Sequence, residues 1–132
     1  MTTYPLDTSI AGRISEAMSQ GGDLYFFHFL FLAWCILFVM HLRNPNARFW
    51  SSKVLVSLSI LTGFMGPFHY FFQTWSISLM VVATSGVVDP AMWAYDQMTV
   101  LTASLVILLT AMVFLGLSTW AWIMPRPDKP GD

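Results

Sequence analysis

The sequence predicts an all-α integral membrane protein with three transmembrane helices. Three apolar stretches, residues 24–42, 54–75 and 98–123, make up about half of the 132-residue chain, and none contains a charged side chain. Each is long enough to cross a bilayer, because a helix of roughly 20 apolar residues spans the hydrocarbon layer. The composition agrees, since 56% hydrophobic and 10% charged residues do not suit a small water-soluble domain. We therefore expect one membrane domain over residues 1–132.

The basic residues predict how the helices are oriented. Arg43, Arg48 and Lys53 lie in the short connection after the first span, and Arg126 and Lys129 follow the third. The second connection, residues 76–97, contains no Lys or Arg. Because positively charged loops stay in the cytoplasm, we expect the N-terminus outside and the C-terminus in the cytoplasm. We take the bacterial inner membrane as the default location.

The segment before the first span, residues 8–20, predicts a short helix lying on the outer membrane surface. Asp7 or Thr8 would cap its start, and Gly21-Gly22 would end it. Its apolar residues share one side at helical spacing: Ile10, Ile14, Ala17 and Met18.

Three further segments carry local predictions. Residues 77–83 are too apolar for a free loop, so the second span either continues as a helix beyond the membrane or folds back into the interface. Pro67 removes a backbone hydrogen bond and predicts a kink in the second span. The proline-rich residues 124–132 predict a disordered tail.

The second and third spans each carry a line of small and hydroxyl residues, which lets membrane helices approach closely and hydrogen-bond. One interpretation is packing of the three helices within the chain. The other is an oligomer whose helices line a pore or bind a partner helix through these faces. The residues are Ser59, Thr62, Gly63, Gly66, Tyr70 and Gln73 in the second span, and Thr99, Thr102, Ala103 and Thr110 in the third.

The histidines are the ionisable residues inside the spans, and such residues are functional candidates. His28 and His69 fall at similar depth in the predicted topology, so they are candidates for a shared haem or metal site; the alternative is a structural or interfacial role for both. His41, next to Arg43 in the charged connection, is expected at the interface.

No carboxylate lies in a span and no nucleophile or nucleotide-binding motif is present, so we predict neither an autonomous proton pump nor an enzyme. The net charge of -1 suggests no nucleic-acid partner.

Several short motifs resemble the MotA/TolQ/ExbB proton-channel family. They are Ser19-Gln-Gly-Gly-Asp-Leu-Tyr before a span ending in His41-Leu-Arg43, then Leu61-Thr-Gly-Phe-Met-Gly66, and Met98-Thr-Val-Leu-Thr102-Ala. The chain departs from the family in having only residues 44–52 where the family has a large cytoplasmic helical segment. The resemblance implies a homo-oligomer, typically a pentamer, that surrounds partner helices and couples proton flow to them. It also implies that Thr62, Thr99 and Thr102 face the pore.

Two functions remain open from the sequence. The first is a non-catalytic membrane subunit that assembles through the small and hydroxyl faces, as a channel-like homo-oligomer or as part of a hetero-complex with other membrane subunits. The second is a membrane anchor of a respiratory or photosynthetic electron-transfer complex, with His28 and His69 near haem b or quinone. The first function requires no cofactor.

Overall fold

The computed structural model describes residues 9–19, 22–44, 48–87 and 89–123. This part of the chain forms four helices: α1 (Ile10–Ser19), α2 (Leu24–Arg43), α3 (Arg48–Ala83) and α4 (Pro90–Ile123). Three of them, α2, α3 and α4, are long and apolar enough to cross a membrane. The predicted all-helical fold with three spanning helices is therefore confirmed, and the bilayer is the expected surrounding of its apolar surface.

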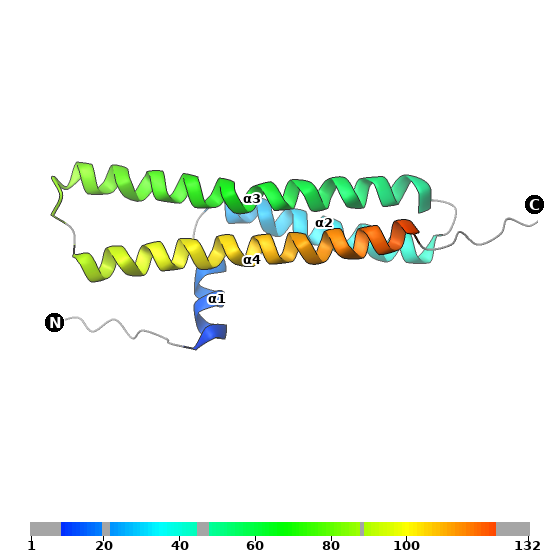
Figure 1. Ribbon diagram of the computed structural model, residues 1–132, viewed down its shortest axis with the longest axis horizontal. Coiled ribbons are helices and arrows are strands. Elements are labelled where there is room, and N and C mark those ends of the chain that lie inside the picture. The colour runs from blue at the N-terminus through cyan, green and yellow to red at the C-terminus, as the bar shows by residue number, and fades with distance from the viewer. Residues whose placement is uncertain (1–8, 20–21, 45–47, 88, 124–132) are drawn as a thin grey trace, which may run out of the picture.

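The two long helices, α3 and α4, lie side by side and antiparallel, and α2 packs along only one half of them (Figure 1). The short helix α1 lies across the bundle near its middle and packs against α4. Its start is capped by Ser9, whose Oγ accepts a hydrogen bond from the Gly12 amide at 3.1 Å. The caps expected at Asp7 or Thr8 lie outside the described residues, as does the tail 124–132.

The helices α3 and α4 are much longer than the spans predicted at 54–75 and 98–123. With 36 and 34 residues they are about 54 and 51 Å long at about 1.5 Å per residue. Of the two alternatives for residues 77–83, the structure has the first, because α3 continues as a helix to Ala83. It also continues through Pro67 without a break.

A tight turn joins α3 to α4. The Gly86 amide donates to the Val81 carbonyl and the Ser85 amide to the Val82 carbonyl, which is the Schellman pattern of a helix C-terminus. Ser85 and Gly86 have φ of 56° and 80°, the left-handed conformation that this motif requires. On the other side, Asp89 Oδ1 accepts from the Ala91 amide and caps α4. We call the projecting part of α3 and α4, residues 74–97, the tip.

The three long helices interlock through residues spaced alternately three and four apart, the spacing of left-handed helix packing. In α4 the buried line consists of Val100, Ala103, Ser104, Ile107, Ala111, Phe114, Ser118 and Ala121. It packs against small residues of α3 and aromatic residues of α2. Two apolar clusters result, one around Leu24, Phe27, Leu30, Met65 and Ile107 and one around Trp34, Leu55 and Phe114.

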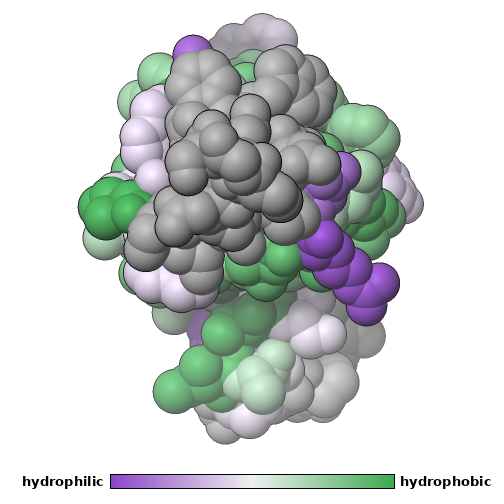
Figure 2. All heavy atoms as spheres, turned by 90° about the vertical axis from the view of Figure 1, so that its right-hand side faces the viewer, coloured by the Kyte–Doolittle hydropathy of each residue, from purple (hydrophilic) through white to green (hydrophobic). Residues whose placement is uncertain are grey.

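The end of the bundle opposite the tip carries the exposed basic side chains Arg43 and Lys53. Figure 2 looks at this end and shows hydrophilic side chains gathered on one side among apolar ones. Polar groups at a helix end and apolar groups along the helix sides are the distribution that a bilayer requires.

Candidate functional site

A polar network joins the start of α2 to α3. Asp23, just before α2, accepts hydrogen bonds on both carboxylate oxygens: Oδ2 from His69 Nδ1 at 2.5 Å and Oδ1 from Gln73 Nε2 at 3.0 Å. The side chains of His69 and Asp23 are only 3% and 9% exposed. Because His69 and Gln73 lie one turn apart on α3, one carboxylate holds both side chains. The network therefore holds the start of α2 at the same height along the bundle as His69 and Gln73 of α3.

A small cavity adjoins this network between α1, α3 and α4. It has a volume of about 180 Å³. Its polar lining contains one charged group, the half-buried carboxylate of Asp96, which has no hydrogen-bond or ion-pair partner within the described ranges. Its lining residues are Ala17, His69, Gln73, Ser76, Ile77, Met80, Asp96, Thr99 and Val100.

A second polar cluster lies in the middle of the bundle. Trp34 Nε1 on α2 donates to Ser59 Oγ on α3 and Ser118 Oγ on α4, at 3.1 and 3.2 Å, and the two hydroxyls are 3.1 Å apart. All three residues are buried. The indole also stacks on the Phe114 ring, with centroids 3.9 Å apart. One side chain of α2 therefore links all three long helices.

The small residues of α3 form its contact with α4. Gly63 and Gly66 face Ala111 and Leu108 of α4. Thr62 is fully buried, and its hydroxyl donates to the Leu58 carbonyl one turn earlier. Together with Ser59, these residues are covered by the chain's own helices. At these four positions α3 packs against α2 and α4 of the same chain, and the oligomer interpretation of the face stays a prediction.

We predict opposite outcomes for two glycine variants on this contact. A Cβ at Gly66 would lie 2.8 Å from Leu108 Cγ and 3.3 Å from the Ser104 carbonyl oxygen, whereas a Cβ at Gly63 would meet Ala111 Cβ at an ordinary 3.6 Å. Gly66→Ala should therefore lower the free energy of unfolding by about 1–3 kcal/mol, the usual cost of overpacking, and Gly63→Ala should not. Unfolding in mixed detergent micelles measures both; equal losses would contradict the predicted asymmetry.

Four other residues of the predicted small and hydroxyl faces lie beside the contact between α3 and α4 rather than in it. Thr99, Thr102 and Thr110 are half-buried, and each hydroxyl donates to the carbonyl four residues earlier in α4. Tyr70 is half-buried and makes an edge contact with Phe71. Their pore-facing role concerns an oligomer and stays a prediction.

The histidines have separate partners. His28 Nε2 donates to the Met18 carbonyl at 3.1 Å, which joins α2 to α1, while His69 is held by Asp23. This hydrogen bond uses His28 Nε2, and Nδ1 is the other ring nitrogen that could bind a metal. His41, expected at the membrane interface, is buried within the chain and hydrogen-bonds with Ser51 Oγ at 2.6 Å. Within the described ranges, no group of three or more His, Cys, Asp or Glu residues could hold a metal ion.

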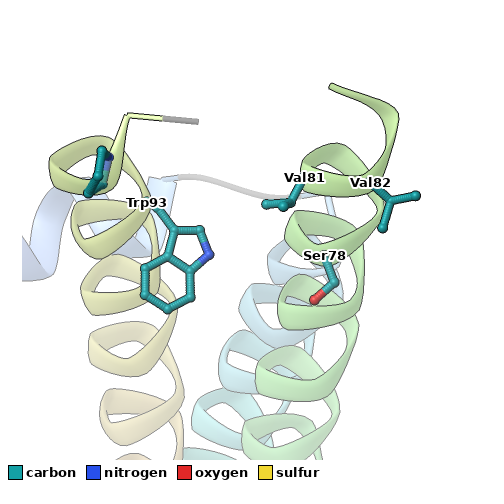
Figure 3. A pocket seen from close by; sticks show the side chains of 5 residues that line it. Ser78, Val81, Val82 and Trp93 are labelled. Atoms are coloured by element: carbon teal, nitrogen blue, oxygen red, sulfur yellow. The ribbon is translucent and has the colours of Figure 1, made fainter. Parts of the chain in front are cut away.

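A larger cleft opens at the tip between α3 and α4. It has a volume of about 520 Å³ and is lined by Ser78, Val81, Val82, Pro90 and Trp93. Figure 3 shows the Trp93 indole extending from α4 into the space between the helices, with Ser78 and Val81 on the facing helix. Among the described residues, no charged side chain lines it. Its chemistry suits an apolar occupant.

Comparisons with protein-family models, with curated proteins and with solved structures find no match to this chain. What the chain does must therefore be inferred from its own geometry.

Proposed function

We propose that this chain is a non-catalytic integral membrane subunit of a larger hetero-complex, and that its tip binds an apolar helix of a partner subunit. The observation that carries the proposal is the mismatch between helix length and bilayer thickness. A helix tilted by 40° crosses a hydrocarbon layer of about 30 Å within about 39 Å. Since α3 and α4 are about 54 and 51 Å long, part of each lies outside the hydrocarbon layer.

The position of α2 indicates which part projects. Its 20 residues give about 30 Å, which matches one hydrocarbon layer. Asp23 holds the start of α2 level with His69 and Gln73. The ten residues of α3 from Thr74 to Ala83 therefore extend about 15 Å beyond α2.

The projecting surface is apolar although the hydrocarbon layer does not cover it. Large contiguous apolar surface in water marks a protein contact. The uncharged cleft beside Trp93 offers a partner helix a groove with an aromatic wall. The exposed apolar side chains of the tip are Trp75, Leu79, Met80, Val82, Val87, Met92 and Trp93.

The burial of the α3 face favours a hetero-complex over a channel-like homo-oligomer. A pore requires polar residues on a free helix face. Here Ser59, Thr62 and Gly66 are covered by α2 and α4. The resemblance to the MotA/TolQ/ExbB family therefore rests on the sequence motifs and the three spans.

Val82→Asp should release the chain from its complex. Val82 lines the cleft and is 76% exposed, so a carboxylate there costs the free chain little but opposes an apolar partner. Ile10→Asp is the matched control, because Ile10 is 79% exposed and lies on α1, outside the tip and its cleft. Native gels and native mass spectrometry of mildly extracted membranes should show the 14.9 kDa chain in a larger hetero-complex, lost in Val82→Asp only.

Two results would contradict the proposal. One is a chain that migrates as a single copy after mild extraction. The other is a discrete homo-oligomer unaffected by Val82→Asp, which would favour the channel alternative. A haem band in the visible spectrum that disappears in His69→Ala would instead favour the electron-transfer anchor.

A further inference from the structure

We propose that the 180 Å³ cavity beside His69 binds a protonated primary amine, of the kind carried by an ethanolamine lipid headgroup. The inference concerns a ligand site and does not depend on the partner proposed for the tip. It rests on the hydrogen-bonding roles of the lining side chains, on their charge and on the level at which the cavity lies.

The first argument is that Asp23 orients two lining side chains so that their acceptor atoms remain free. An ionised carboxylate only accepts hydrogen bonds, so His69 Nδ1 and the Gln73 amide nitrogen are the donors to it. In the neutral imidazole, His69 Nε2 is then an acceptor, and Gln73 keeps its carbonyl oxygen. Neither atom has a partner in the described part of the chain. His69 itself is 2% exposed, so this acceptor is built into the protein.

The second argument is charge. The half-buried carboxylate of Asp96 borders the cavity without a protein partner among the described residues, and no basic residue lines it. The described basic residue of α1, Arg13, borders a separate crevice of only about 10 Å³, together with Glu16. The hydroxyls of Ser76 and Thr99 complete a lining rich in acceptors. A primary ammonium matches such a lining, because it offers a positive charge and three N–H donors.

The third argument is position. Ala17 of α1 forms one wall, and the cavity lies beside the residues that hold the start of α2. This is the level at which a bilayer-length α2 meets the headgroups. The apolar wall residues Ile77, Met80 and Val100 suit the aliphatic part of an aminoalkyl group.

The test compares ethanolamine with choline headgroups on identical acyl chains. Both headgroups carry the same positive charge, but the choline nitrogen has no N–H donor. Native mass spectrometry of the purified full-length chain should show about tenfold tighter binding of the ethanolamine lipid, as expected for one or two charge-assisted hydrogen bonds. Asp96→Asn should abolish this preference, and Asp89→Asn should preserve it. Asp89 is the matched control, because it is exposed, caps α4 and does not line the cavity.

A second variant tests the proposal independently in case Asp96→Asn fails to fold. Thr99→Val keeps the charge, removes one acceptor and should reduce the preference; far-UV circular dichroism checks helicity in each variant. Equal binding of the two lipids by the wild-type chain would overturn the proposal, and so would a preference that survives in folded Asp96→Asn.

Competition identifies the source of the amine. If free ethanolamine displaces the lipid while tetramethylammonium does not, the cavity accepts the ammonium group from either source. If neither displaces it while the headgroup preference holds, the lipid is the source. Displacement by tetramethylammonium as effective as by ethanolamine would overturn hydrogen-bonded recognition of a primary amine.

Discussion

Trp34→Ala is expected to lower the free energy of unfolding by about 3–5 kcal/mol, the usual cost of removing a buried tryptophan. The variant loses the stack on Phe114 and the N–H that joins Ser59 to Ser118. In a membrane the loss arises mainly from packing, because lipid is as apolar as the protein interior. The cavity left between three helices cannot be filled by movement of α2 alone.

Two controls separate the contributions at this position. Trp34→Phe keeps a ring to stack on Phe114 and should lose about 1 kcal/mol for the hydrogen bond, in the range measured within membranes. Trp120→Ala removes an indole that is half-exposed on α4 and should cost little. Unfolding in mixed micelles measures all three, and a Trp34→Ala loss no larger than that of Trp120→Ala would refute the central role of Trp34.

The second large effect is expected at Asp23. Asp23→Ala should lower the free energy of unfolding by about 3 kcal/mol, because it leaves the buried donors of His69 and Gln73 without an acceptor. It should also loosen the start of α2 from α3, which proteolysis near residue 22 would detect.

A double-mutant cycle tests this explanation. Replacing both partners of a buried pair by apolar residues costs less than removing one. Asp23→Leu with His69→Leu should therefore be more stable than the sum of the two single losses predicts. Strict additivity of the two changes would mean that the hydrogen bond contributes little.

Hydropathy was sufficient to predict the helices, because lipid demands long uncharged segments whatever their partners. It was not sufficient to predict where α3 and α4 end, since the tip is as apolar in composition as the spans that it continues. Ser59, Thr62 and Gly66 are buried on one side of α3, but periodicity does not tell which helix covers such a face.

The polar centres were harder to predict from the sequence. The Asp23 network depends on pairing across 46 and 50 positions, which no local pattern reveals. Trp34 lies in an aromatic-rich helix where nothing distinguishes it from its lipid-facing neighbours. One signal was present: Asp23 is an acidic residue directly before the first span, and His69 lies within the last two turns of the second.

The unequal helix lengths also set the electrostatic surroundings of the tip. The headgroup layer adds about 5–7 Å to each side of the hydrocarbon, and the surface potential of anionic lipids falls off within a Debye length of about 8 Å. If the start of α2 lies at the edge of the hydrocarbon, as proposed above, α3 extends about 15 Å beyond it, and its last turn lies near the limit of that field. A partner bound there would experience little of the lipid charge, whereas α1, at the start of α2, lies within its reach.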